Sequence, residues 1–236
     1  MTKSRRAVSD SPAQRITAAI IEKLEQGTKP WVKPWRGVPV SRPLRSCGTP
    51  YRGMNTFWLW MVADGCGYAS PYWMTYRQCQ KLGGQVRKGE KSTIAIFYKS
   101  YTKEVENAEG EADIENRRVL KAYAEPLRDR VTLPPAELFE AYDSYYATLA
   151  HELSHWTGHC SRLDRDLKNR FGSDAYAAEE LIAELSSAIL GAELGLPVTH
   201  LDHHASYIAS WLKILKSDER AILTAAAKAE EAASLL

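Results

Sequence analysis

The sequence predicts an α+β protein in which an N-terminal α+β part precedes a mainly helical C-terminal part. Apolar residues at helical spacing dominate after residue 130, whereas short alternating segments bounded by glycine lie before it. Charge divides the chain at a similar place: residues 1–103 hold 18 Lys+Arg and 5 Asp+Glu, and the remaining residues hold 13 and 24. The length of 236 residues fits two modest domains, which we expect at 11–125 and 126–236 after a disordered basic tail at 1–10.

The first predicted element is an amphipathic helix. Ser11 and Pro12 are the residue types of an N-cap and a first helical turn, and Gly27 is typical of a helix C-terminus. The apolar residues between them follow the helical period; they are Ile16, Ala19, Ile20 and Leu24. The next segment, 28–53, is rich in Pro, Gly, Trp and Arg without helical period, which predicts an extended loop over a surface.

The rest of the N-terminal part mixes helices and strands. An apolar, aromatic run predicts a buried helix at 54–63, and a second helix begins at 75–82. After Gly83-Gly84, a basic turn at 88–91 joins two segments that we expect to form a β-hairpin, its second strand lying at 92–101. A further strand at 117–123 is placed to pair with this hairpin across an acidic loop.

The C-terminal part begins with a short strand at 130–133, which Pro134-Pro135 ends. Four apolar-periodic segments after it predict helices, at 147–156, 175–194, 204–215 and 218–236. No internal repeat is present.

Composition excludes some classes of protein. No apolar run approaches the roughly 20 residues of a membrane helix, and the basic N-terminus is not followed by the apolar stretch of a secretory signal, so a cytoplasmic protein with no membrane partner is expected. The cysteines are widely separated and form no C-x-x-C pair, so we expect them to be reduced and without a role in metal binding or redox chemistry. They are Cys47, Cys66, Cys79 and Cys160.

The segment His151-Glu152-Leu153-Ser154-His155 matches the pattern H-E-x-x-H. On a helix, positions i and i+4 share one face, so His151 and His155 can bind one metal ion while Glu152 lies beside the open coordination position. Zn²⁺ is the expected cofactor, with Mn²⁺ as the alternative. Glu152 would then act as general base for water attacking an amide carbonyl.

The third metal ligand has more than one candidate. A metzincin arrangement requires a histidine three residues after Gly158, but that position is Ser161, and His159 follows the glycine too closely. A glutamate on the later helix fits better, with Glu180 as the ligand and Glu184 as the carboxylate that orients a histidine. Exchanged roles for these two glutamates remain an alternative.

Two further points about the site stay open. The histidines could be ordinary core residues and the glutamates a solvated helix face, although burying such carboxylates without cations would be costly. A donor for the oxyanion should also exist, and the candidates are Tyr142, Tyr145, Tyr146, His200, His203 and His204.

The strand at 130–133 is a candidate edge for docking an extended peptide.

The basic N-terminal part combines positive charge with aromatic side chains, since residues 1–103 contain 13 of the 23 aromatic residues. Lys and Arg follow a phosphate backbone, and aromatic faces stack unpaired bases, so this mixture favours single-stranded DNA over duplex DNA. For any one tryptophan a core position is the commoner explanation, above all for Trp58 and Trp60. The candidate DNA contacts are Arg52, Asn55, Trp73, Tyr76, Arg77, Lys88 and Lys91.

Several long segments resemble one known family. TPYRGMNTFWL and GGQVRKGEKSTIAIFYK are similar to the N-terminal domain of ArdC-type antirestriction proteins. YYATLAHELSHWTGHCSRLDRD, YAAEELIAELSSAILGAELG and YIASWLKILKSDERAI are similar to their zincin-like metallopeptidase domain. By matching position, the resemblance implies a metal site at His151, His155 and the acidic pair of EELIAE, with Glu152 as catalytic base.

The resemblance implies a protein of mobile elements that binds single-stranded DNA and protects incoming DNA from host restriction. The metallopeptidase site would act on a DNA-associated protein; alternatively the metal domain is a scaffold for a DNA-coating protein, or the chain is an accessory of replication or priming. One departure from the family is the short connection 124–128, where members usually have a longer stretch. The sequence leaves the oligomeric state open.

Overall fold

The structure is a computed structural model of the chain and describes residues 11–31, 41–96, 123–125, 129–167, 173–196 and 205–236. The N-terminal part contains α1 (Pro12–Glu25), β1 (Leu44–Arg45), α2 (Met54–Cys66), β2 (Tyr72–Trp73) and α3 (Tyr76–Lys81). From residue 123 onward the described residues form β3 (Tyr123–Glu125), β4 (Arg130–Thr132), a 3-10 turn (Ala136–Leu138), α4 (Tyr142–Trp156), α5 (Asp174–Leu194), α6 (Ala205–Ser217) and α7 (Ala221–Leu235), so β3 still lies within the expected first domain. This mixed but mainly helical architecture confirms the predicted α+β class.

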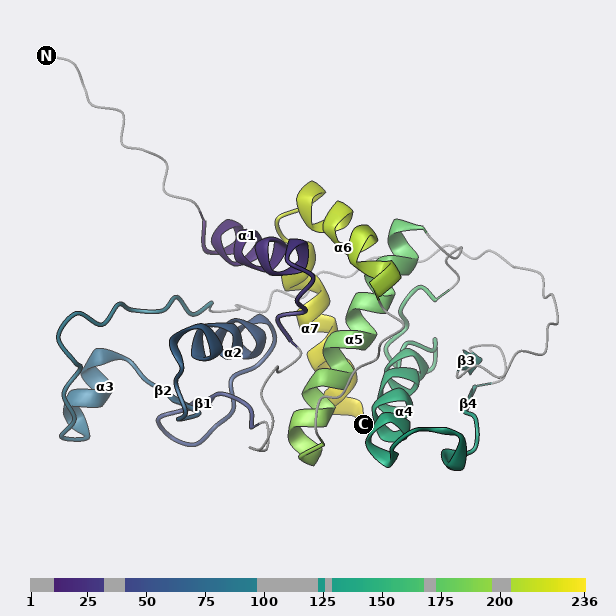
Figure 1. Cartoon of the computed structure of the whole chain (residues 1–236), viewed down its shortest axis with the longest axis horizontal. Helices are drawn as coiled ribbons and strands as arrows, with labels where there is room; N and C mark the ends of the chain where they lie inside the picture. The colour runs from purple at the N-terminus through teal and green to yellow at the C-terminus, as the bar shows by residue number, and fades with distance from the viewer. Residues whose placement is uncertain (1–10, 32–40, 97–122, 126–128, 168–172, 197–204) are drawn as a thin grey trace, which may run out of the picture.

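Helix α5 is the centre of the fold and packs against α4, α6 and α7 (Figure 1). Fourteen of its 21 residues are buried, including apolar residues on every side. A helix that is apolar all round requires neighbours on all faces, which explains why three other helices surround it. Ser173 caps its N-terminus by accepting a hydrogen bond from the Tyr176 amide, and Gly195 ends it in the left-handed conformation.

The N-terminal segment completes the core of this helical bundle. Helix α1 packs on α6 with Ile16, Ile20 and Leu24 buried, as the helical period predicts. The segment after it is not a surface loop at its start: Trp31 is buried edge-on against Trp211 of α6, with ring centroids 5.7 Å apart. One hydrophobic cluster therefore runs from α1 to α7, across the boundary expected near residue 125.

Helix α1 begins at its predicted cap, whereas α4 begins at Tyr142, five residues before the predicted start at 147. Ser11 and Thr75 each form a capping box with a glutamine three residues later, Gln14 and Gln78, so both N-termini have their amides satisfied. Helix α2 extends three residues beyond the predicted end and stops at Gly67, which adopts a positive φ of 66°.

The predicted hairpin is wrong for its described part, because residues 85–96 contain no strand. Side chains of α2 bind this backbone instead. The Asn55 side-chain amide donates to the Ile96 carbonyl and its oxygen accepts from the Ile96 amide, while the Trp58 indole donates to the Ile94 carbonyl. These bonds satisfy backbone groups that a strand ladder would otherwise use. Residues 97–101 of the predicted second strand lie outside the described residues.

The two small sheets also differ from the prediction. β1 pairs in parallel with β2, and β3 pairs antiparallel with β4, with Ala124 opposite Val131. Only Tyr123 of the predicted strand at 117–123 is described, and it pairs with Thr132 rather than with the region of the expected hairpin. The strand predicted at 130–133 is confirmed as β4, which packs together with β3 against α4.

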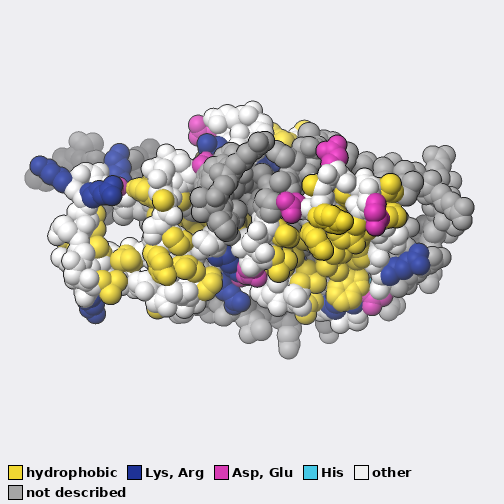
Figure 2. Space-filling model, turned by 60° about the horizontal axis from the view of Figure 1, so that its bottom comes forward, with side chains coloured by type: hydrophobic (Ala, Val, Ile, Leu, Met, Phe, Trp, Pro, Cys, Tyr) yellow, Lys and Arg dark blue, Asp and Glu magenta, His cyan; other side chains and the backbone are white. Residues whose placement is uncertain are grey.

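Figure 2 shows that Lys and Arg side chains gather at the end of the molecule that carries α3, whereas a broad hydrophobic area covers the opposite part. Further Lys and Arg side chains lie in the middle of this face and toward its other end. Within the described part of the chain, no helix is long and apolar enough to cross a membrane.

Candidate metal centre and nucleic-acid surface

The histidines of the H-E-x-x-H motif lie on α4, facing α5. The sequence from Tyr142 to Trp156 contains no Pro or Gly, so the helix is uninterrupted and His151 and His155 lie one turn apart on the same face. Their Nε2 atoms are 3.2 Å apart. The packing of α4 against α5 brings both imidazole rings opposite the first turns of α5.

Glu180 on α5 supplies the third donor. Its carboxylate oxygens lie 3.5 Å from His151 Nε2 and 3.6 Å from His155 Nε2. The three side chains together form a group of the kind that holds a metal ion. Glu180, which the sequence names as the candidate third ligand, is a member of this group, and Glu184 is not.

The spacing of these donors fits a small divalent cation. Ligand bonds of about 2.0–2.1 Å in tetrahedral geometry place ligand atoms about 3.3–3.4 Å apart. The observed separations of 3.2, 3.5 and 3.6 Å are close to that edge length. Two imidazoles and one carboxylate are also the donor set of catalytic zinc sites, which keep a fourth position open.

The electrostatics of the group favour an ionised Glu180. Burial would raise the pKa of Glu180, but the hydrogen bond from His151 and the charges of both histidines lower it to about 2. Burial would likewise lower the pKa of His155, whereas its hydrogen bond to Glu179 and the charge of Glu180 raise it above the ordinary value. The site is therefore arranged around a carboxylate that stays charged near neutral pH.

Glu179, which has no place in the sequence prediction, contacts the other side of a candidate ligand. Its Oε1 lies 3.2 Å from Nδ1 of His155. Glu184, expected in this orienting role, instead accepts a hydrogen bond from Lys29 Nζ at 2.8 Å. Helical spacing predicts that Glu184 shares a face with Glu180. It does not show that Glu179, rather than Glu184, contacts Nδ1 of His155.

Tyr176, one turn before Glu180 on α5, is a second residue that the sequence did not reveal. Its hydroxyl forms a hydrogen bond with the Glu180 carboxylate and lies 3.3 Å from the hydroxyl of Tyr207 on α6. Burial, together with these bonds and the charge of Glu180, raises the pKa of Tyr176. The phenol therefore remains a donor at any physiological pH.

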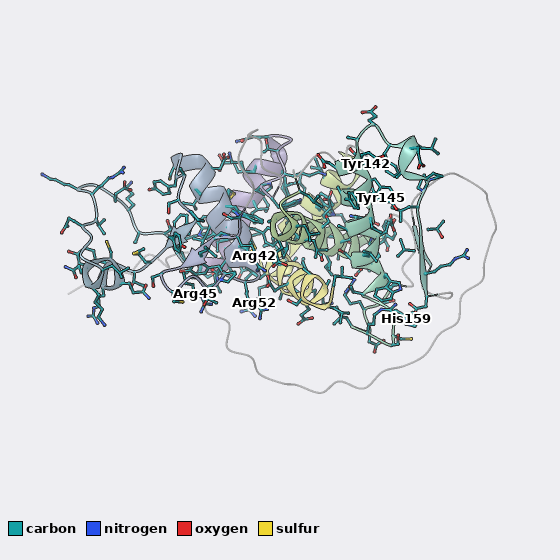
Figure 3. All side chains as sticks on the ribbon, turned by 90° about the horizontal axis from the view of Figure 1, so that it is seen from below. Arg42, Arg45, Arg52, Tyr142, Tyr145 and His159 are labelled. Atoms are coloured by element: carbon teal, nitrogen blue, oxygen red, sulfur yellow. The ribbon has the colours of Figure 1, made fainter. Side chains whose placement is uncertain are left out.

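The remaining predicted site residues are placed less centrally. Glu152 is half-buried on α4, and its charge contributes to the raised pKa of His155. His159 is not part of the metal group; its Nδ1 lies 2.8 Å from the Ser161 hydroxyl. In Figure 3 it lies beyond one end of α4, whereas Tyr142 and Tyr145 lie toward the other end.

Tyr145 packs edge-on against Phe139 and Tyr146, and Tyr142 and Tyr146 are exposed. These contacts give Tyr145 a packing role near the N-terminal end of α4. The other predicted oxyanion donors, His200, His203 and His204, lie outside the described residues.

Most of the candidate DNA contacts lie on one exposed, basic region. Tyr76 and Arg77 on α3 are exposed, as are Lys88 and Lys91 in the loop that follows. Trp73 is half-buried beside Tyr68, with ring centroids 5.9 Å apart. Other exposed apolar and aromatic side chains lie on the same region, namely Tyr68, Tyr72, Met74, Leu82 and Val86.

Two candidates differ from this pattern. Asn55 is 7% exposed and both ends of its amide bind the Ile96 backbone, so this side chain holds the protein chain together and is not available to DNA. Arg52 is 70% exposed at its side chain, yet its Nε lies 3.2 Å from Glu230 Oε1 on α7. Arg42, Arg45 and Arg52 lie together beside α7 in Figure 3.

Comparisons with known proteins match this chain to two family models. Residues 103–228 match the family model of the zincin-like metallopeptidases, and residues 10–124 match the model of the N-terminal domain of the anti-restriction factor ArdC. The uncharacterized protein y4eC of Sinorhizobium fredii is 36% identical over 274 residues, covering 93% of this chain and 89% of the relative. Because this chain has 236 residues, that match includes positions with no counterpart here.

A DNA primase TraC of Escherichia coli is 36% identical over 282 residues, but the chain spans only 26% of that protein. Two crystal structures of the antirestriction protein ArdC from the R388 plasmid are similar over 96% of this chain. The metal-free one has 38% identity and a TM-score of 0.80, and the Mn(II)-bound one has 40% identity and a TM-score of 0.76. Domain models, sequence and fold agree, and the chain belongs to the ArdC-type antirestriction proteins with a zincin-like metallopeptidase domain.

Proposed function

We propose that this chain binds single-stranded DNA and hydrolyses peptide bonds in a DNA-associated protein, and that it thereby protects incoming mobile-element DNA from host restriction in the cytoplasm. The observation that carries the proposal is the donor group of His151, His155 and Glu180, which lies in the same chain as an exposed basic and aromatic surface. The domain division that we propose is a basic tail at 1–10, a DNA-binding part at 11–125 and a metallopeptidase part at 126–236.

Zn²⁺ is the cofactor that we propose, with Mn²⁺ as the alternative because a Mn(II)-bound structure of the R388 ArdC protein exists. His151, His155 and Glu180 would hold it. When bound there, a divalent cation supplies Lewis acidity toward a carbonyl oxygen and lowers the pKa of a coordinated water toward about 7. Glu180 also balances part of the positive charge, since its low pKa keeps it ionised.

Glu152 is the catalytic base in this proposal. Its position next to His151 on α4 places it beside the donor group without making it a member of that group. It would accept a proton from the attacking water and return it to the leaving nitrogen of the cleaved amide. The nearby strand β4 would dock an extended peptide, in keeping with its position against α4.

The exposed region around α3 would bind the DNA. Lys88, Lys91 and Arg77 would contact phosphates, and Tyr76 and Trp73 would stack on unpaired bases. Base stacking of this kind contributes about 1–3 kcal/mol for each base and tolerates any sequence. Arg52 would add a phosphate contact beside α7.

One experiment separates the enzymatic part of the proposal from the binding part. Glu152→Gln in the full chain should abolish proteolysis and antirestriction while single-stranded DNA affinity stays unchanged. Lys88→Glu with Lys91→Glu should weaken DNA binding. The slope of the logarithm of the DNA affinity against the logarithm of the salt concentration should become shallower by about 0.7 for each phosphate that the protein no longer neutralises. Reversing Lys213 and Lys216 on α6 is the matched control for net charge and should leave DNA affinity unchanged.

The proposed peptidase is wrong if Glu152→Gln retains full antirestriction. That result would favour a DNA-coating protein in which the metal domain is a scaffold. The relatedness to TraC supports a further alternative, an accessory role in replication or priming. It would be favoured if neither variant changed antirestriction but the charge reversal impaired primer synthesis.

A further inference from the structure

We infer that Arg165 is a positioning residue of the metal centre, which acts through Glu179 to fix the ring of His155. This inference rests on the proposed metal site and assigns a task to two residues that lie outside it. The three side chains form a continuous chain of contacts. Glu179 Oε1 lies 3.2 Å from His155 Nδ1 and accepts a hydrogen bond of 2.8 Å from Arg165 Nη2.

The side chain of Arg165 is buried, and all three nitrogens of its guanidinium group donate hydrogen bonds. Its side chain is 5% exposed. Nε donates to Glu179 Oε2 at 3.1 Å, Nη1 donates to the Thr157 hydroxyl at 2.9 Å, and Nη2 donates to the Ser154 carbonyl at 2.6 Å. The group thus joins α5 to the last turn of α4, which carries His155.

The turn after α4 is built to deliver this arginine. The Arg165 amide donates to the Gly158 carbonyl at 2.9 Å, which brings residue 165 back against the end of α4. A Cβ on residue 158 would lie 3.0 Å from Arg165 Nη2 and 2.9 Å from Leu167 Cδ2. Gly158, which suggested a metzincin motif in the sequence, therefore leaves room for Arg165.

The chemistry of a metal-binding imidazole explains why such a chain is useful. Nε2 can bind a cation only when its lone pair is free, so the ring proton must be on Nδ1. A carboxylate at Nδ1 accepts that proton's hydrogen bond, fixes the tautomer and increases the basicity of Nε2. Glu179 is in this position for His155.

Arg165 makes this arrangement possible because Glu179 is itself buried. A buried carboxylate without a cation would be costly, and it would tend to become protonated and lose its use as an acceptor. Arg165 compensates the charge and also fixes both carboxylate oxygens with a planar group. A lysine would supply charge at one point but could not bind Glu179, Thr157 and Ser154 together.

The test is a titration of the full-length protein with Zn²⁺ alone and with Mn²⁺ alone, with the melting temperature of the metal-free protein measured in parallel. Arg165→Ala and Glu179→Ala are expected to lower metal affinity by about 10–100-fold, the range found when partners of metal ligands are removed. Arg165→Lys and Glu179→Gln keep part of the hydrogen bonding and should give smaller losses. They also provide folded variants if the alanine variants do not fold.

Arg162 is the matched control, because it belongs to the same turn and its Nε also donates to a carbonyl at the end of α4, that of Trp156, at 2.8 Å. Its carboxylate partner is Asp129, which is not bonded to a candidate ligand. Arg162→Ala should therefore lower the melting temperature while leaving metal affinity within about twofold of the original, since every partner of a metal ligand stays in place.

Equal metal affinities in Arg165→Lys, Glu179→Gln and the unchanged protein would overturn the inference. It would also be overturned if Arg162→Ala weakened metal binding as much as Arg165→Ala, because the turn would then have only a structural role. These outcomes leave the proposed peptidase intact. If the unchanged protein bound neither metal, the proposed metal centre and this inference would both be wrong.

Discussion

Lys29 Nζ lies 2.8 Å from Glu184 Oε1, one helical turn beyond the candidate ligand Glu180 on α5. The lysine comes from the N-terminal segment, and the glutamate belongs to the helix that forms the centre of the metallopeptidase domain. Their side chains are only 15% and 4% exposed. The basic N-terminal part is therefore joined to the helix that carries the candidate ligand Glu180 by an ion pair that solvent screens weakly.

Lys29→Met is expected to destabilise the fold by about 3 kcal/mol, because it removes the cation from a buried carboxylate. The free energy of unfolding in urea measures the effect. Lys216→Ala is the control: Lys216 pairs with Glu25 at 2.6 Å, but both side chains are exposed, so the cost should stay below about 1 kcal/mol. If both substitutions lowered the free energy of unfolding equally, the buried pair of Lys29 and Glu184 would contribute no more stability than the exposed pair.

Arg42 forms a second link between the two parts of the chain. Its Nη2 binds Glu230 of α7, its Nη1 binds Glu193 of α5, and the Gly53 amide donates to the same Glu230 carboxylate. Arg42→Ala should cost about 3–5 kcal/mol, because it breaks a buried ion-pair network. Thermal and urea unfolding would measure this loss.

Arg45 provides the comparison for Arg42. It lies on β1 and is exposed. Its guanidinium carbon lies over the Tyr51 ring, 5.4 Å from the ring centroid. Arg45→Ala should cost about 0.5–1 kcal/mol, as for an exposed cation–π interaction. A cost for Arg42→Ala as small as this would show that the network does not hold the two parts together.

The sequence predicted the features that depend on local spacing. Helix α1 and helix α5 follow from capping residues and apolar periodicity, and His151 and His155 share a face because they are four residues apart. Glu180 was named because it shares one face of a later helix with Glu184, four residues on. These features need no knowledge of how distant segments meet.

Features that depend on long-range packing were missed. The backbone at Ile94 and Ile96 alternates like a strand in sequence, but Trp58 and Asn55 bind it before a ladder can form. The ion pair of Glu184 was missed for a similar reason, because a lysine 155 residues earlier reaches it. No local pattern shows such a partner.

The metal-free protein should lose stability as the pH rises above about 6.5. The pKa of His155 is raised in the folded state, so its contribution is complete below the unfolded-state value and disappears as the pH passes the folded-state value. Melting temperatures in the presence of a chelator, compared with those of His155→Gln, measure this contribution. Identical pH profiles for the two proteins would contradict it.

Acid should act on the same group of residues in the opposite way. The pKa of Glu180 is lowered to about 2, so its contribution to stability is complete above the unfolded-state value of about 4.3 and is lost as the pH falls toward 2.

Metal affinity should rise with pH up to neutrality, because a cation requires a deprotonated imidazole. A metal affinity that is independent of pH between about 5 and 7, the range around the ordinary pKa of histidine, would contradict this assignment.

Tyr176→Phe is expected to weaken metal binding about tenfold. The Tyr176 hydroxyl donates to Glu180, and a hydrogen bond to a charged group contributes about 1.5–3 kcal/mol. Part of this energy holds the carboxylate in the orientation that faces both histidines, so the variant should keep the fold but bind Zn²⁺ and Mn²⁺ less tightly. Tyr207→Phe is the control, because it removes the 3.3 Å interaction with Tyr176 but leaves the bond to Glu180 in place. The two variants should therefore differ by several-fold in metal affinity, and equal affinities would show that Tyr176 does not orient the ligand.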